Sequence, residues 1–110
     1  MGECLREQHC TPQTRQLLTP QQLEVLLAQL PGWAIQDHHL VKSFKFSNYY
    51  TSIAFVNALA WVVHREDHHP DLSVHFNRVV VQWSTHDVSG LTRNDFICAA
   101  KCQDLYKESA

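Results

Sequence analysis

The amino-acid sequence predicts an α+β fold, in which a four-stranded antiparallel sheet carries three helices on one face. Two observations predict this class. Apolar side chains recur at helical spacing in residues 19–30, 48–66 and 92–106. Between these segments, apolar and polar residues alternate with the period of two that is typical of half-buried strands. The expected order is helix-strand-strand-helix-strand-strand-helix, and placing the helices on one face buries all the apolar surfaces in one core.

The length and charge of the chain limit the classes of protein to which it can belong. Its 110 residues suffice for one domain with a modest core. We expect a mobile N-terminal tail over residues 1–17, which lack periodicity, and a single domain over residues 18–110. The net charge of −2 disfavours direct binding of nucleic acid. No run approaches the ~18 apolar residues of a membrane span, and the N-terminus lacks an apolar signal core, so we expect a cytoplasmic protein.

The first helix is predicted to begin after Thr19. Thr19 supplies the cap, Pro20 suits the first turn, and Gln22 completes a capping box. The apolar stripe of this helix consists of Leu23, Leu26, Leu27 and Leu30. Pro31-Gly32 should end the helix, so this segment is expected to be scaffold.

Two strands joined by a turn are expected between residues 33 and 46. A polar break over residues 36–39 follows Ile35 and suits the turn. After it the large apolar side chains fall on one parity, interrupted by Lys42: Leu40, Phe44 and Phe46.

The longest helix is predicted from Asn48 to about Glu66. Its core-facing stripe, about 100° wide, consists of Phe55, Val56, Leu59, Val62 and Val63. Trp61 lies on the far side of the helix from this stripe. It is either an isolated surface aromatic or part of a second contact surface, such as one between subunits.

A hairpin is predicted over residues 72–85, and its register can be derived from the alternation. If Asn77-Arg78 is a two-residue turn, partners across the hairpin have numbers that sum to 155. The apolar pairs are then Leu72 with Trp83, Val74 with Val81, and Phe76 with Val79. Extending the same ladder places His69 opposite His86. Because imidazole can give and take a proton near neutral pH, this convergence predicts an acid/base site.

The last helix is predicted to begin after the Ser89-Gly90 turn. Thr92 suits the cap and Asp95 occupies the capping-box position, where its carboxylate would accept a hydrogen bond from the cap backbone. The face of Asp95 also carries Cys98, Ala99, Cys102, Leu105 and Tyr106. This helix should therefore pack on the sheet.

The four cysteines predict neither a disulfide framework nor a metal centre. Cys4 and Cys10 lie in the polar N-terminal segment, and Cys98 and Cys102 are one helical turn apart. No Cys-x2-Cys pair exists, and His64 with His68 offers only two ligands. We therefore predict no metal and assign Cys98 and Cys102 to the core.

The segment from His64 to Asp95 resembles the signature of the pterin-4a-carbinolamine dehydratases. It contains H-x3-HHP, an aromatic residue six positions past the proline, and then STHD, GLT and ND. The resemblance covers roughly Leu18 to Leu105, and it implies a sheet of four strands with helices on one face. This sequence departs from the family pattern at two positions. At His64 the family often has an acidic residue, and at Leu72 it often has an aromatic one.

The resemblance implies a hydro-lyase that converts a 4a-hydroxytetrahydropterin to the quinonoid dihydropterin, in tetrahydrobiopterin-type recycling. It implies that His68, His69 and His86 form the acid/base cluster, with the division of roles left open. Pro70 would shape the pterin site, Asp95 would line it, and His64 would neighbour it. The reaction needs a general acid and a general base but no cofactor.

The second candidate function belongs to a different class: the protein would be a binding module that docks on a helix of a partner protein. Animal relatives of this family also act as dimerisation cofactors of a transcription factor, and the face around Trp61 could serve such a contact. Self-association is equally compatible with that face. We expect a homodimer or a homotetramer, because a four-stranded sheet leaves two edges unpaired. A histidine-bound metal is a third alternative, with no complete ligand set to support it.

Overall fold

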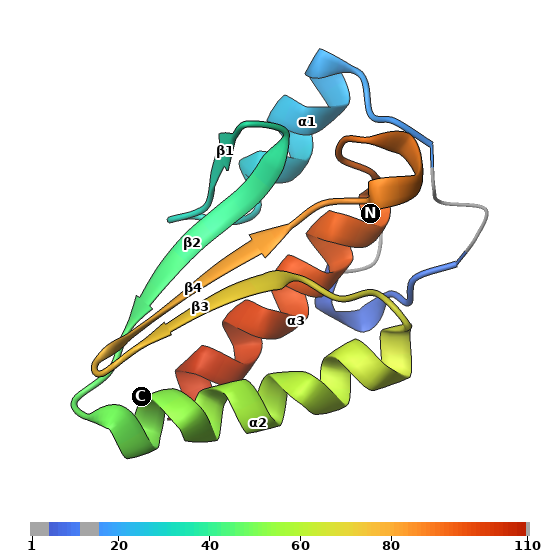
Figure 1. The fold of residues 1–110 in the computed structure, drawn as a ribbon. Coiled ribbons are helices and arrows are strands. Elements are labelled where there is room, and N and C mark those ends of the chain that lie inside the picture. The colour runs from blue at the N-terminus through green and yellow to red at the C-terminus, as the bar shows by residue number, and fades with distance from the viewer. Residues whose placement is uncertain (1–4, 12–15, 110) are drawn as a thin grey trace.

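A computed structural model describes residues 5–11 and 16–109 of the chain. The helices are η1 (Leu5–Glu7, a 3-10 turn), α1 (Pro20–Leu27), α2 (Tyr49–Glu66), η3 (His86–Val88, a 3-10 turn) and α3 (Arg93–Ser109). The strands are β1 (Ala34–Gln36), β2 (His39–Lys45), β3 (Asp71–His75) and β4 (Arg78–Trp83), and they form one sheet in the order β1-β2-β4-β3. All neighbouring strands are antiparallel, so the predicted α+β class and element order are confirmed (Figure 1).

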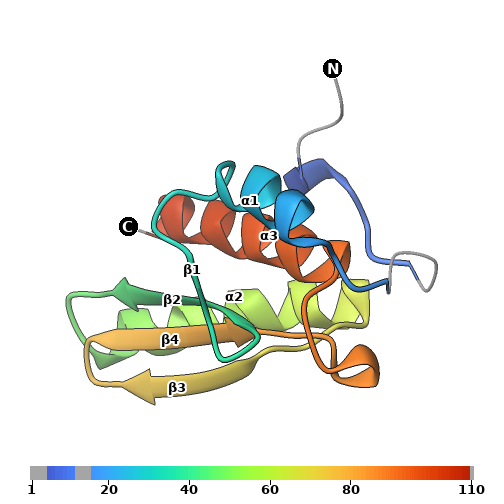
Figure 2. The same ribbon diagram turned by 90° about the horizontal axis from the view of Figure 1, so that it is seen from above.

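The two long helices pack against one face of the sheet. Figure 2 shows α2 and α3 on the same side of β2, β4 and β3, with α1 beside α3. The centre of the core is formed by fully buried side chains from both layers, including Leu40, Phe44, Phe55, Leu59, Val79, Val81, Trp83 and Phe96. Phe44 and Phe55, whose ring centroids are 5.0 Å apart, join β2 to α2. Within the described residues, no helix has the length and apolarity to cross a membrane.

The starts of α1 and α2 agree with the sequence signals. The Thr19 hydroxyl accepts from the backbone N–H of Gln22, while the Gln22 side chain accepts from the N–H of Thr19. Asn48 and Thr51 make the equivalent reciprocal pair at α2. The C-cap of α2 is Asp67, in the left-handed region with φ 51°, and this residue turns the chain toward β3.

The register of the β3–β4 hairpin differs from the predicted one. Val74 pairs with Val79 and Leu72 with Val81, so partner numbers sum to 153 rather than 155. The turn is Phe76-Asn77 instead of Asn77-Arg78. The carbonyls of these two turn residues accept hydrogen bonds from the Ser52 hydroxyl and the Phe46 N–H, which anchors the turn one residue earlier.

This shift of two keeps the parity of the strands, because side chains alternate between faces with a period of two. Val79, Val81 and Trp83 are fully buried, as the alternation predicts. The partner strand is less buried than predicted: Leu72 is 40% exposed, and Phe76, in the turn, is 65% exposed. As an edge strand, β3 contributes little to the core.

Residues 5–11 lie within the predicted N-terminal tail but pack on the domain. Leu5 in η1 is 4% exposed and belongs to the core cluster. The Lys101 ammonium of α3 donates to the Arg6 carbonyl at 2.8 Å. These contacts have no periodicity of their own, which is why the sequence pattern did not reveal them. Residues 1–4 and 12–15 of the predicted tail lie outside the described residues.

Candidate active site

The site is organised around a contact between the ends of two helices. His68 follows the Asp67 cap of α2, and its Nε2 lies 2.7 Å from Oδ1 of Asp95 in the first turn of α3. The Asp95 side chain is fully buried, and that of His68 is 13% exposed. A buried carboxylate requires hydrogen-bond donors, and His68 supplies one of them when its Nε2 carries a hydrogen.

The second oxygen of Asp95 has two further donors. Oδ2 accepts from the Thr85 hydroxyl at 2.8 Å and from the Thr92 backbone N–H at 2.9 Å. The predicted acceptance from the cap backbone is therefore confirmed. The Thr92 hydroxyl, 2.8 Å from that of Thr85, can donate to it and complete the chain of bonds. Because the Thr85 hydroxyl and the Thr92 N–H are donors, Asp95 acts as an acceptor toward both.

This arrangement determines which nitrogen of His68 is available for chemistry. When Asp95 also accepts from Nε2–H, the neutral imidazole keeps its lone pair on Nδ1. The ring is held on a second side by Trp83, with centroids 5.8 Å apart and planes 6° from parallel. His68 is thus oriented by both a carboxylate and an indole, as in sites where a histidine must present one nitrogen.

His69 points to a different surface from His68, as the extended backbone before Pro70 predicts. It lines a cavity of about 440 Å³ between α2 and β3. His64 and Pro70 line the same cavity, together with Val56, Leu59, Ala60, Val63, Asp67 and Leu72. This volume lies within the range of ~300–1,000 Å³ that is common for small-molecule sites. The predicted site residues His64, His69 and Pro70 are therefore brought together, on a largely apolar surface.

His86 is exposed in η3 and is not among the residues that line this cavity. The predicted pairing of His69 with His86 is wrong, because it depended on the register that sums to 155. With the observed register, extension of the ladder brings Thr85 toward His68. Both residues indeed bind Asp95. Thr85 belongs to the STHD motif, but its contact with Asp95 was missed because no local pattern links them.

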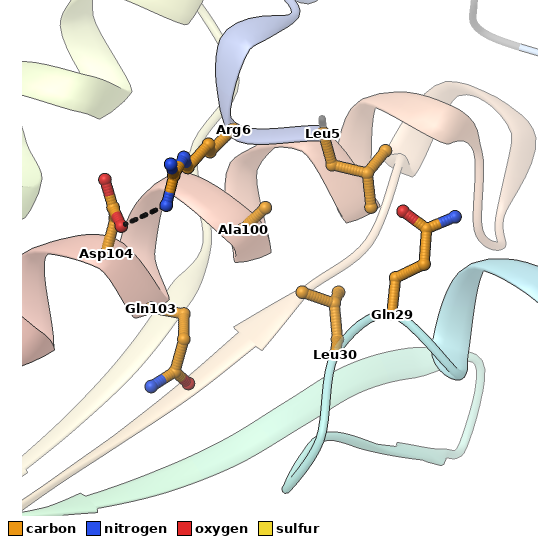
Figure 3. A pocket seen from close by; sticks show the side chains of 7 residues that line it. All are labelled: Leu5, Arg6, Gln29, Leu30, Ala100, Gln103 and Asp104. Atoms are coloured by element: carbon orange, nitrogen blue, oxygen red, sulfur yellow. Dashed lines mark hydrogen bonds and ion pairs between the residues drawn. The ribbon is translucent and has the colours of Figure 1, made fainter. Parts of the chain in front are cut away.

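A second hollow, of about 300 Å³, lies between η1, the end of α1 and α3 (Figure 3). Its lining residues are Leu5, Arg6, Gln29, Leu30, Ala100, Gln103 and Asp104. Arg6 and Asp104 form an exposed ion pair at 3.3 Å. Among the residues that the structure describes, no histidine lines this hollow, whereas His64 and His69 line the cavity between α2 and β3, so we regard that cavity as the better candidate for acid/base chemistry.

Comparisons with known proteins place the chain in one family. The sequence pattern of the family described as pterin 4 alpha carbinolamine dehydratase matches residues 16–105. The chain belongs to this family. A relative from Xanthomonas euvesicatoria is 53% identical over 108 residues, covering 94% of this chain and 92% of the relative. One from Chromobacterium violaceum is 54% identical over 104 residues, covering 94% and 96%. Both are provisionally named pterin-4-alpha-carbinolamine dehydratases, which supports a dehydratase-like function.

Two solved structures share the fold. The crystal structure of a transcriptional coactivator/pterin dehydratase from Brucella melitensis superposes with a TM-score of 0.79 at 32% identity, covering 82% of this chain and 98% of that one. A pterin dehydratase-like protein identified as a RuBisCO assembly factor of the alpha-carboxysome has a TM-score of 0.57 at 21% identity, covering 67% and 86%. The second likeness concerns the fold alone.

Proposed function

We propose that this protein removes water from a 4a-hydroxytetrahydropterin to give the quinonoid dihydropterin. The substrate loses a hydroxyl group from C4a and a proton from N5, and the two leave as water. A hydro-lyase of this kind regenerates the oxidised pterin that tetrahydrobiopterin recycling requires. The reaction needs one group that protonates the leaving hydroxyl and another that accepts the N5 proton.

The observation that carries this proposal is the buried contact of His68 with Asp95 at 2.7 Å. Asp95 holds Nε2–H, so that Nδ1 of His68 can accept a proton. The resulting imidazolium would be stabilised by the carboxylate. A positioned acid or base contributes roughly 10²- to 10⁴-fold to the rate. Two such groups would account for most of a modest enzymatic acceleration.

We also propose His69, which faces the cavity, and His86, which lies outside it, as acid/base residues, and the division of the acid and base roles is left open. Pro70 keeps the chain extended so that His69 faces the cavity that His64 shares. Asp95 acts as a positioning residue through His68. His64 neighbours the pterin and changes the charge near His69 when it is protonated.

The test is the decay of a carbinolamine produced in situ by a pterin-dependent hydroxylase, followed with and without this protein. We expect an acceleration that survives exhaustive chelation, and near-complete loss of it in a double variant with His69→Ala and His86→Ala. His38→Ala, which changes an exposed turn histidine, is the matched control. Full activity in the double variant would remove both residues from the mechanism.

A second candidate function is docking of a partner protein or another subunit on α2. Trp61 on this helix is 77% exposed, and we propose that it belongs to an apolar patch of the kind that marks a contact surface. We propose a homodimer or homotetramer that uses the Trp61 face and the β3 edge. A foreign partner helix is the alternative occupant. A protein that binds a partner but leaves carbinolamine decay unchanged would favour this second function.

A further inference from the structure

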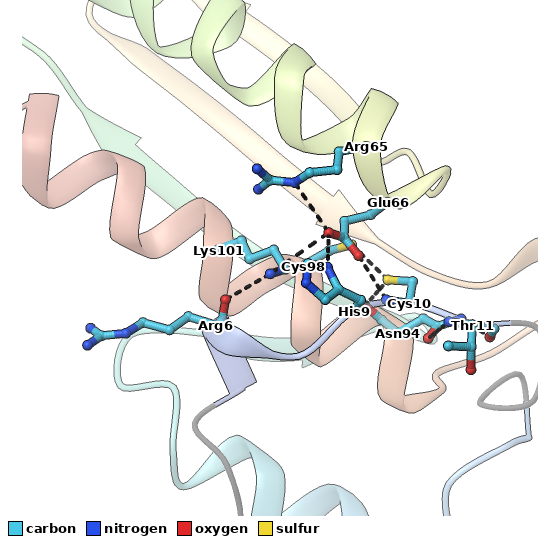
Figure 4. A network of polar contacts seen from close by, with 9 residues as sticks. All are labelled: Arg6, His9, Cys10, Thr11, Arg65, Glu66, Asn94, Cys98 and Lys101. Carbon is cyan, nitrogen blue, oxygen red and sulfur yellow. Dashed lines mark hydrogen bonds and ion pairs between the residues drawn. The ribbon is translucent and has the colours of Figure 1, made fainter.

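Residues 9–11 form a strap that joins the end of α2 to the start of α3 (Figure 4). At one side the strap binds Glu66, the last residue of α2. His9 Nδ1 lies 2.9 Å from one carboxylate oxygen of Glu66, and the Cys10 N–H donates to the other at 2.8 Å. The Glu66 side chain is almost fully buried, so these donors replace lost water contacts.

At the other side the strap binds Asn94 in the first turn of α3. The Thr11 N–H donates to Oδ1 of Asn94 at 3.3 Å, and Nδ2 of Asn94 donates to the Thr11 carbonyl at 3.1 Å. Glu66 precedes Asp67-His68 in the chain, and Asn94 precedes Asp95. The strap therefore holds the two chain segments from which the His68–Asp95 contact is made.

The strap also brings two thiols together. Cys10 Sγ lies 3.4 Å from Cys98 Sγ, although the two residues are 88 positions apart in the chain. Cys98 is fully buried on α3, whereas Cys10 is only half-buried. A disulfide has an S–S distance of about 2.05 Å, so the sulfurs need to approach by only about 1.4 Å. The chain around Cys10 is already held by the hydrogen bonds of Cys10 with Glu66 and of Thr11 with Asn94.

We propose that Cys10 and Cys98 are a redox-modification site, at which a hydroperoxide converts the strap into a covalent link between the N-terminal segment and α3. First, Cys10 attacks the peroxide and becomes a sulfenic acid, and the peroxide is reduced to water or an alcohol. The Cys98 sulfur then attacks the Cys10 sulfur. The sulfenic hydroxyl leaves with the Cys98 proton as a second water. The net change is two thiols and one hydroperoxide to one disulfide, one alcohol or water, and one water.

The two cysteines have different parts in this sequence. The hydrogen bond with Cys10 and the burial of the side chain raise the pKa of the Cys98 thiol, so Cys98 is not the first thiol to react with the peroxide, and it gives up its proton only when it attacks the oxidised Cys10. Cys10 is the less buried residue of the pair. Cys102 is fully buried as well, and burial raises its pKa, which makes it a suitable unreactive control on the same helix.

The first experiment treats the full-length protein with hydrogen peroxide, alkylates the remaining thiols and maps the peptides by mass spectrometry. We expect a peptide pair joined through Cys10 and Cys98, two hydrogens lighter than the reduced pair, that a dithiol reverses. It should form equally in Cys102→Ser and be lost in Cys10→Ser. Alkylated Cys10 and Cys98 after full treatment, or a link from Cys10 to Cys4 or Cys102 instead, would overturn the proposal.

The second experiment measures thermal unfolding and does not depend on enzymatic activity. Closing a loop of this length should raise the midpoint by about 5 °C or more in the oxidised wild type relative to the reduced protein. Cys10→Ser should show no difference between the two treatments, and its reduced form confirms that the variant folds. An unchanged or lowered midpoint in the disulfide-linked wild type would contradict a link that forms without distorting the folded protein.

Discussion

His68 Nε2 and Asp95 Oδ1 lie 2.7 Å apart, and this contact joins the end of α2 to the start of α3 across 27 positions of the chain. Asp95 is fully buried and accepts three hydrogen bonds when His68 donates the third. The contact therefore has two consequences that can be measured separately. It stabilises the fold at the junction of the helices, and it fixes the orientation of the histidine proposed to act in catalysis.

Asp95→Asn should affect both properties. The amide removes the negative charge that would stabilise the His68 imidazolium. If the NH2 group of the amide faces Thr85 and Thr92, it cannot accept their hydrogen bonds. We expect a loss of about 1–3 kcal/mol in the free energy of unfolding, measured with urea. We also expect a fall of at least about 10-fold in the dehydration rate. Asp71→Asn, at an exposed position of β3, is the matched control and should change neither.

Glu66 should make the stability of the fold depend on acid pH. Burial alone would raise its pKa, but the Cys10 N–H, His9 and Lys101 outweigh burial and hold the pKa below its ordinary value of 4.5. A depressed pKa contributes stability that is present above the unfolded-state value and is lost as pH falls through the folded-state value. The free energy of unfolding should therefore fall below about pH 4.5.

Urea unfolding between pH 3 and pH 7 checks this expectation. Glu66→Gln should be less stable than the wild type at pH 7, and its stability should decline less steeply toward pH 3. Glu24→Gln removes an exposed carboxylate from α1 and should keep the wild-type slope. Parallel wild-type and Glu66→Gln curves would contradict the depressed pKa of Glu66.

The hairpin shows how far the sequence alone specifies this fold. The alternation of apolar residues correctly predicted that Val79, Val81 and Trp83 are buried, because that result depends only on parity. It could not locate the turn. The carbonyls at Phe76 and Asn77 are anchored by Ser52 and Phe46, which are distant in the chain. A register shift of two residues leaves every side chain on the same face of the sheet, so the alternation of apolar residues cannot detect it. The predicted meeting of His69 and His86 was wrong for that reason.

The candidate site was partly predictable for a similar reason. The capping position of Asp95 follows from local spacing, and its acceptance from the Thr92 N–H was foreseen. Its contacts with His68 and Thr85 depend on how α2, β4 and α3 pack, which no local pattern encodes. The strap at residues 9–11 is a further example. Its hydrogen bonds with Glu66 and Asn94 arise from tertiary packing of a segment without periodicity.

Trp61 provides a test of assembly. Burial of a large aromatic side chain at the centre of an interface commonly contributes more than 2 kcal/mol to association. We expect light scattering at micromolar concentration to give a dimer or tetramer for the wild type and a larger monomer fraction for Trp61→Ala. Val25→Ala, which removes an exposed apolar side chain from α1, should leave the assembly unchanged. A monomeric wild type would contradict the proposed subunit contact.

His64 tests the electrostatics of the cavity that it shares with His69. A carboxylate at this position would favour protonated imidazole nearby, whereas a protonated His64 disfavours it. In His64→Glu the acid limb of the pH–rate profile should therefore move to higher pH. The reason is that the histidine that acts as the catalytic base would bind its proton at a higher pH. Initial rates from pH 5.5 to pH 8.5 would reveal the shift. Superimposable profiles for the two proteins would remove His64 from the site.

The most direct test of the account is the initial rate of carbinolamine dehydration for the wild type, His68→Ala and His75→Ala. His75 is an exposed histidine on β3 and serves as the control for loss of an imidazole. We predict that His68→Ala lowers the catalysed rate about 100-fold or more while the protein remains folded, and that His75→Ala matches the wild type. A His68→Ala rate equal to that of the wild type would contradict the central role assigned to the His68–Asp95 contact.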